Sequence, residues 1–200
     1  LGHVLAVIDL MYNEGFVSSD GATQDRDLAG DAVWLAGVVA ASLPGEAEAW
    51  GLAALLTIQH ARSAARFSAE GDLVLLPDQD RSRGTRAEIA EGLPVRAGLN
   101  PPMPLTDAGG RGVATFADQS LLQARIAAEH ARAGTAADTD WRAIERSYAD
   151  LERVTGSPVG RLNRAVAAAE AGGPLAGLAL LGGLDAALPR SHQLPAVRAA

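Results

Sequence analysis

Apolar side chains recur at helical spacing in the last third of the chain. Two successive stretches each place apolar residues at positions i, i+3, i+7 and i+10, which is one stripe along an amphipathic helix. The first stripe is Trp141, Ile144, Tyr148 and Leu151, and the second is Val159, Leu162, Val166 and Ala169. We therefore expect two helices that pack against each other. The residues expected in their core are Trp141, Ile144, Tyr148, Leu151, Leu162 and Val166.

Residues that begin and end helices flank both stripes. Asp138–Asp140 offers N-caps for the first helix, and Ser157-Pro158 combines an N-cap with a proline at the first helical position. Gly172–Pro174 ends the second helix and begins a third. The distance from Trp141 to Leu175 is 34 residues, which is the period of a tetratricopeptide-type helical repeat. This part of the chain is predicted to be such a repeat followed by part of another.

Helical patterns also fill most of the first half of the chain. Val4 to Tyr12 is apolar on nearly every side, as in a helix buried between other helices. Further helices are predicted from Asp25 to Ala41, from Glu46 to Arg66 and from Gln119 to Arg132, with acidic residues near the starts and basic residues near the ends of several. Phe67 to Leu76 contains a turn and an apolar run that predict one minor β-hairpin.

The composition favours helices over a β-sandwich. Alanine occupies 42 of the 200 positions, and aromatic residues make up only 4%. A short helix is expected over Thr85 to Glu91, and the prolines and glycines between Asn100 and Gly112 indicate a loop. We expect an all-α fold with an N-terminal helical subdomain over residues 1–100, a loop over 101–116 and the tetratricopeptide-like repeat region over 117–200.

Charge and residue usage exclude several classes of protein. The net charge of −7 argues against direct nucleic-acid binding, which needs clustered cations. There is no cysteine, no apolar stretch long enough for a membrane span and no signal peptide, so a cytoplasmic protein is expected. The chain lacks an initiator Met and stops within the apparently helical stretch Leu194 to Ala200, so we expect it to be a piece of a longer protein.

The densest polar cluster in the sequence is Asp78, Asp80, Arg81 and Arg83, which Glu14 could join across the fold. Paired carboxylates can bind a divalent metal or carry out acid–base catalysis. More often such residues cap a turn and pair with neighbouring arginines, and the spacing matches neither EF-hand nor zincin motifs. A small-molecule or metal sensor that uses Glu14, Asp78 and Asp80 is the alternative hypothesis.

The motifs of common enzymes are missing from the sequence. No two of His3, His60, His130 and His192 have ligand spacing on one helix. The sequence contains no G-x-S-x-G nucleophile elbow, no Walker motif and no G-x-G-x-x-G. We therefore expect no catalytic residue, no cofactor and no metal, and a protein that is not an enzyme.

Asn163 and Arg164 are polar residues on an otherwise apolar helix, with Glu170 about two turns further on. In helical repeats such residues can point into a concave groove and hold the backbone or a carboxylate of a partner. In the other interpretation, Asn163 satisfies a nearby loop carbonyl and Arg164 is solvated. The sequence leaves both interpretations open.

Three motifs in order along the chain resemble one family. They are Val7-Ile8-Asp9-Leu10-Met11-Tyr12-Asn13-Glu14-Gly15-Phe16; Asp78-Gln79-Asp80-Arg81-Ser82-Arg83 with Ile89-Ala90-Glu91-Gly92; and Ser157-Pro158-Val159 with Leu162-Asn163-Arg164-Ala165-Val166-Ala167 and Glu170. From near Leu5 to at least Leu181 the chain is similar to the C-terminal tetratricopeptide-like extension of a subgroup of ECF RNA polymerase sigma factors. It departs from that pattern at Gly84, where the family usually has a tryptophan, and at Pro94 to Val113, where a regular helix is replaced.

The resemblance implies a regulatory or protein-interaction domain that acts in transcription initiation by the full-length protein. Its implied partners are the sigma regions of the same protein and core RNA polymerase, while promoter DNA is contacted only through a missing N-terminal part. No membrane contact is implied. The polar positions expected to serve an internal or partner contact are Asn13, Glu14, Asp78, Asp80, Arg81, Asn163 and Arg164.

Overall fold

The computed structural model describes residues 1–16, 26–66, 74, 78–80, 116–135 and 137–199. Its helices are α1 (Gly2–Phe16), α2 (Arg26–Ser42), α3 (Ala47–Ala61), α4 (Ser63–Arg66), α7 (Phe116–Arg132), α8 (Trp141–Thr155), α9 (Pro158–Gly172), α10 (Pro174–Leu180), α11 (Leu184–Ala187) and α12 (Gln193–Ala199). None of the described residues lies in a strand, and the all-α prediction is confirmed. Apart from Val74, the predicted hairpin lies outside the described residues, as does the predicted helix over Thr85 to Glu91. Residues 101–115 of the loop predicted over 101–116 also lie outside them, whereas its last residue, Phe116, is already the first residue of α7.

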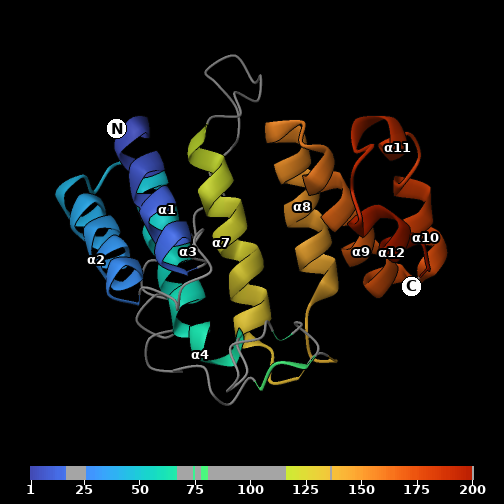
Figure 1. Cartoon of the computed structure of the whole chain (residues 1–200), viewed down its shortest axis with the longest axis horizontal. Coiled ribbons are helices and arrows are strands. Elements are labelled where there is room, and N and C mark those ends of the chain that lie inside the picture. The colour runs from blue at the N-terminus through green and yellow to red at the C-terminus, as the bar shows by residue number, and fades with distance from the viewer. Residues whose placement is uncertain (17–25, 67–73, 75–77, 81–115, 136, 200) are drawn as a thin grey trace.

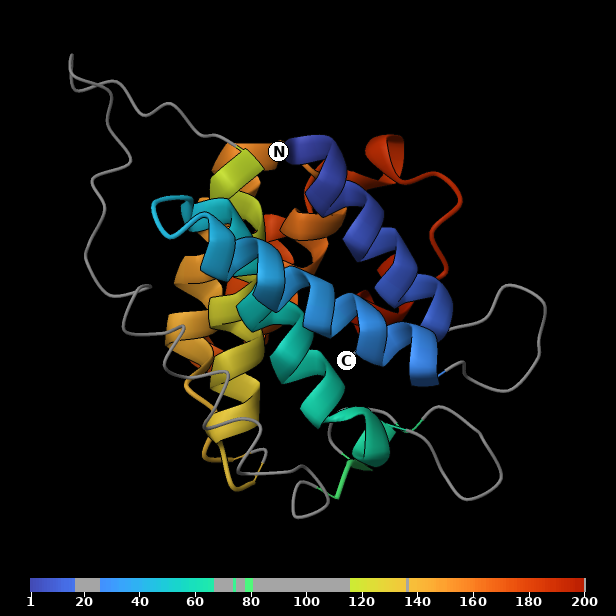
Figure 2. The ribbon, with the colours of Figure 1, turned by 90° about the vertical axis from the view of Figure 1, so that its left-hand side faces the viewer.

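The described helices form a side-by-side array in which most long helices pack on the helix before and the helix after them, and α3 packs on α7 across the intervening segment of the chain. The order of contact is α1, α2, α3, α7, α8, α9 and α10, and α11 and α12 also contact α9 (Figure 1). Figure 2 looks along this array from the end that carries α1 and α2. None of the helices among the described residues is long and apolar enough to cross a membrane.

Side-chain caps fix the ends of the α8–α9 hairpin. The Ala143 backbone N–H donates to Asp140 Oδ1 at 2.9 Å at the start of α8, and the Gly160 N–H donates to Ser157 Oγ at 3.3 Å at the start of α9. Each cap satisfies a backbone donor that the first helical turn leaves unpaired. Pro158 and Pro174 stand in the first turns of α9 and α10. The predicted boundaries of these helices are therefore confirmed.

Burial in the first three helices differs from the sequence prediction for α1. Only one stripe of α1 is buried, with Leu5, Ile8 and Tyr12 in the core. Val4, Val7 and Leu10 on its other side are exposed by 52%, 56% and 67% of their surface. The prediction of a helix surrounded on all sides was wrong, because among the described helices α1 packs on α2 and, to a smaller extent, on α3.

α3 is the most buried helix of this half of the chain. It has α2 on one side and α7 on another, and its buried residues extend around most of its circumference. Small residues make the close packing with α2 feasible, since Ala29, Ala32, Ala36 and Ala40 of α2 are all buried. On the α7 side, Ala54 and Leu55 form a cluster with Ala124. The regions predicted as two subdomains thus share the α3–α7 interface.

The core of the α8–α9 hairpin follows the predicted stripes in most positions. Ile144, Leu151 and Leu162 are buried, and Trp141 and Tyr148 are partly buried against the same helices. Val166 is an exception with 37% of its surface exposed.

Val166 is exposed because it lies outside the faces by which α9 contacts α8 and α10, and small residues occupy much of those faces. These buried small residues are Gly160, Ala165, Ala167 and Ala168. The next helix, α10, has 7 residues against 15 in α8, so it does not match the first helix of an equal repeat. The 34-residue repeat period stays a prediction.

Candidate interaction groove

A groove with a volume of about 600 Å³ lies among α3, α4, α7, α8 and α9. Helices from both halves of the chain form its walls, and the short described segments at Val74 and Gln79 contribute to its lining. The groove therefore depends on the α3–α7 interface as well as on the α8–α9 hairpin. We call this feature the interaction groove.

Side-chain amides are concentrated in the interaction groove. Four of the six glutamines of the chain line it, and Asn163 of α9 joins them. The lining glutamines are Gln59, Gln79, Gln119 and Gln123. Arg62, Arg66 and His130 also line the groove, whereas no Asp or Glu does so among the described residues. The described residues that line the groove are thus polar amides, apolar residues and basic residues.

Gln79 holds its segment against the C-terminal end of α3. Arg62 Nη2 donates to Gln79 Oε1 at 3.0 Å, and Gln79 Nε2 donates to the Val74 carbonyl at 3.0 Å. The Val74 backbone N–H donates in turn to the Arg66 carbonyl at 2.8 Å. Within the Asp-Gln-Asp motif, the glutamine therefore faces the groove, and Asp78 and Asp80 on either side of it are exposed.

Asn163 lies at the α8–α9 side of the groove. Its side chain forms a hydrogen bond with Tyr148, which also lines the groove. Burial raises the pKa of the Tyr148 hydroxyl, and the bond to Asn163 offsets part of that shift. The sequence prediction that Asn163 points into a groove is consistent with this position.

Arg164 makes an internal contact between α8 and α9. Its guanidinium donates from Nε to Glu145 Oε1 at 2.8 Å and from Nη1 to Glu152 Oε2 at 3.0 Å. The hydrogen bond to Glu145 is the largest cause of a raised pKa for Arg164. Arg164 does not line the interaction groove. Of the two roles that the sequence suggested for it, an internal contact or a contact with a partner, the structure shows the internal one.

Among the described residues, the other polar residues singled out from the sequence, Asn13, Glu14, Asp78 and Asp80, do not line the interaction groove. Asn13 Nδ2 donates to Asp9 Oδ2 at 3.5 Å along α1, and burial raises the pKa of Asp9. Glu14 is exposed. Among the described residues, which include Glu14, Asp78 and Asp80, no three His, Cys, Asp or Glu side chains are grouped so that they could hold a metal ion. Arg81 lies outside the described residues.

Sequence reasoning missed Gln59, Gln119 and Gln123 as groove residues. A signal was available, because Gln119 and Gln123 are four residues apart and so lie on one face of the predicted helix. Glutamine is also common on solvated helix surfaces, however, and only the packing of α7 against α3 and α8 brings these amides together with Gln59. Gln79 was overlooked in favour of its charged neighbours.

Comparison with known proteins gives two matches. Residues 1–97 match the model of a family of unknown function, DUF6596. A protein of Rhizobium meliloti (strain 1021) that is described as uncharacterized is 40% identical over 182 residues. The aligned region covers 90% of this chain and 40% of that protein, so the chain spans less than half the length of this relative. No solved structure matches the chain.

Proposed function

We propose that this chain is the regulatory, protein-interaction C-terminal domain of an ECF RNA polymerase sigma factor. The observation that carries the proposal is the interaction groove, which is built by helices from both halves of the array and lined by amides and arginines. Concave surfaces of helical arrays commonly bind segments of other proteins. The domain acts in transcription initiation by presenting this groove to a protein partner.

Sequence similarity supports the link to sigma factors. Two of the three motifs that resemble the ECF extension begin within residues 1–97, the region that matches the DUF6596 model. Domains of this type are typically C-terminal domains of sigma-70-like factors. The relative from Rhizobium meliloti is more than twice as long as the aligned region, which leaves length for further domains in that protein.

The proposal divides the work between this domain and the rest of the full-length protein. Promoter DNA is contacted through the N-terminal sigma regions, since the acidic chain described above is unsuited to hold a phosphate backbone. The sigma regions and core RNA polymerase are the partners of this domain. The protein acts in the cytoplasm, and the domain itself catalyses no reaction.

Promoter-specific transcription tests the proposal. Full-length protein with and without residues 1–200 is added to core RNA polymerase and a template that carries its promoter, and both transcript yield and polymerase binding are measured. We expect removal of the domain to change transcript yield. Unchanged yield together with unchanged polymerase binding would refute the regulatory role.

A further inference from the structure

We infer that a second pocket of the chain binds a phosphate group of a small molecule. The pocket has a volume of about 610 Å³ and lies among α8, α9 and α11, toward the C-terminal end of the array (Figure 1). Volumes of roughly 300–1,000 Å³ are typical of small-molecule sites. Arg153, Arg161 and Arg164 all line this pocket, which we call the arginine pocket.

Arg161 has the guanidinium that the protein engages least in the arginine pocket. Within the described part of the chain, its side chain makes one ion pair, from Nε to Glu152 Oε1 at 3.8 Å, and no hydrogen bond. Both terminal nitrogens of its planar fork therefore keep N–H donors for a ligand, and 36% of the side chain is exposed. Such a fork suits phosphate because it donates two parallel hydrogen bonds to neighbouring oxygens.

Glu152 brings two guanidinium groups to the same part of the pocket. Its Oε2 accepts from Arg164 Nη1 at 3.0 Å, while its Oε1 faces Arg161. Arg164 also donates from Nε to Glu145, so its Nη2 is the nitrogen that makes no hydrogen bond to a described residue. Two guanidinium groups thus lie beside one carboxylate in the arginine pocket, and the repulsion between like charges this close favours a bound anion.

Arg153 and Ser157 add further donors to the pocket. Arg153 pairs with Asp150 one turn earlier in α8, but 63% of its side chain is exposed, and exposed pairs of this kind are weak enough for a ligand to compete. Ser157 Oγ accepts from the Gly160 N–H, and its own O–H hydrogen makes no bond to the described residues. A hydroxyl group donates and accepts at once, so Ser157 can still donate to a ligand.

A phosphate group matches these donors better than a carboxylate does. A phosphate monoester has three strong acceptor oxygens and a charge of about −1.5 to −2 at neutral pH, whereas a carboxylate has only two oxygens and a single charge. The arginines come from two helices, α8 and α9, and can therefore donate to different oxygens of one phosphate. Leu184 and Ala187 of α11 add apolar lining that can contact the rest of a small molecule.

Isothermal titration calorimetry of the chain with pyrophosphate tests the inference. We expect saturable binding, and Arg161→Gln should weaken it about tenfold or more because the charged fork is lost. Arg142→Gln is the matched control, since Arg142 is exposed on α8 outside the arginine pocket and the substitution makes the same change in charge. Binding by this control should stay at the wild-type level. Circular dichroism melts establish that each variant is folded.

Glu152→Gln should change the affinity in the opposite direction. It removes the carboxylate that competes with the ligand for Arg161 and Arg164, so pyrophosphate should bind several-fold more tightly. Glu170→Gln is its control, because Glu170 is exposed on α9 outside the pocket. Absence of saturable binding, or equal affinities of Arg161→Gln and Arg142→Gln, would overturn the inference. Equal affinities of folded Glu152→Gln and Glu170→Gln would do so as well.

Two further titrations identify the chemistry and the source of the ligand. Succinate, a dicarboxylate, should bind much more weakly than pyrophosphate, and an equal affinity would overturn the assignment to phosphate. A short glycine peptide with one phosphoserine presents the same group on a protein segment, and it should also bind more weakly than pyrophosphate. Tighter binding of this peptide would assign the pocket to a phosphorylated protein and overturn the assignment to a small molecule.

Discussion

Gly51 of α3 lies directly against the backbone of Leu121 of α7. A Cβ atom at Gly51 would stand 2.8 Å from the Leu121 backbone nitrogen, which is closer than a carbon atom can approach without a shift of one helix. The glycine therefore permits the α3–α7 contact, and this contact joins the two halves of the array. The interaction groove has walls on both sides of the junction.

Gly51→Ala should destabilise the chain. Alanine favours a helix over glycine by about 1 kcal/mol, but the neighbour at Gly51 is backbone and cannot rotate away. Overpacking of this kind costs about 1–3 kcal/mol, so we expect a net loss in the free energy of unfolding, measured by urea denaturation. Gly37→Ala in α2 is the control, because a Cβ there meets nothing within 4 Å, and it should stabilise by roughly 0.5–1 kcal/mol. Equal effects of the two substitutions would contradict the close contact.

Neighbouring residues of α1 should respond very differently to truncation. Ile8 is 4% exposed and packs in the core with Leu5 and Tyr12, whereas Val7 is 56% exposed. Ile8→Ala should lower the free energy of unfolding by about 2–5 kcal/mol through lost burial and a cavity. Val7→Ala should change it by no more than about 0.5 kcal/mol. Thermal or urea unfolding measures both, and a comparable loss for Val7→Ala would mean that this side of α1 is covered.

Arg164 should couple energetically to Glu145. The two side chains are about one quarter exposed and join α8 to α9 at 2.8 Å. A double-mutant cycle with Arg164→Gln and Glu145→Gln should give a coupling of about 0.5–1 kcal/mol that declines with added salt. Arg153→Gln with Asp150→Gln is a matched exposed pair within α8 and should give less. A coupling no larger than that of the control would show that the interhelical pair contributes nothing to stability.

Tyr12 should make the chain less stable at alkaline pH. Burial is the largest cause of the raised pKa of its hydroxyl, and Arg66 lowers the pKa by a smaller amount. The unfolded chain loses this proton near pH 10, where the folded chain still keeps it. The stability contribution is therefore complete below about pH 10 and is lost as the pH rises toward the folded pKa.

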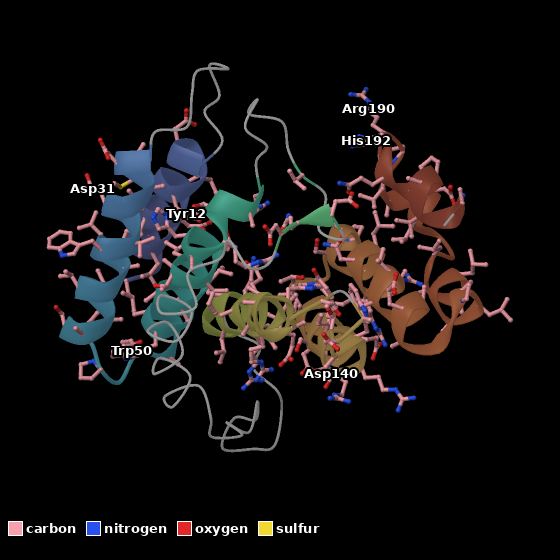
Figure 3. The ribbon with its side chains drawn as sticks, turned by 90° about the horizontal axis from the view of Figure 1, so that it is seen from below. Tyr12, Asp31, Trp50, Asp140, Arg190 and His192 are labelled. Carbon is pink, nitrogen blue, oxygen red and sulfur yellow. The ribbon has the colours of Figure 1, made fainter. Side chains whose placement is uncertain are left out.

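Tyr12→Phe removes this titration. Urea unfolding at successive pH values should show a shallower decline above about pH 10 for the variant than for the wild type. Figure 3 labels Tyr12 on α1, and its ring contacts His60 of α3 edge-on at 6.4 Å between centroids, so phenylalanine can keep the packing. The same decline in both proteins would exclude Tyr12 as its source.

The sequence predicted correctly where helices begin, because a helix start is determined by residues within one helical turn of it. Asp140, Ser157 and Pro174 mark helix starts because capping and the fixed proline backbone act within one turn. Burial was less predictable. The apolar sides of α1 gave no sign that Val7 faces solvent, since this depends on which helices lie next to it.

The groove was also beyond the reach of local patterns. Gln79 and Gln123 are 44 positions apart, and only the order of packing brings both to one surface. Charged residues drew the site prediction to Asp78, Asp80 and Arg164, whereas the residues that line the groove include neutral amides. Asn163 was the exception, because a polar residue on an apolar helix is itself a local signal.

The central claim is that the interaction groove is the surface through which this domain acts in transcription initiation. The most direct measurement is the yield of promoter-specific transcript from core RNA polymerase with full-length protein carrying Gln123→Glu or Gln193→Glu. Gln123→Glu places a carboxylate in the groove without changing side-chain size, and Gln193→Glu makes the same change at an exposed position of α12 outside the groove. The account predicts an altered yield with Gln123→Glu, matching the direction seen when the domain is removed, and a wild-type yield with Gln193→Glu. A wild-type yield from a folded Gln123→Glu protein, under conditions where removal of the domain does change the yield, would contradict the claim.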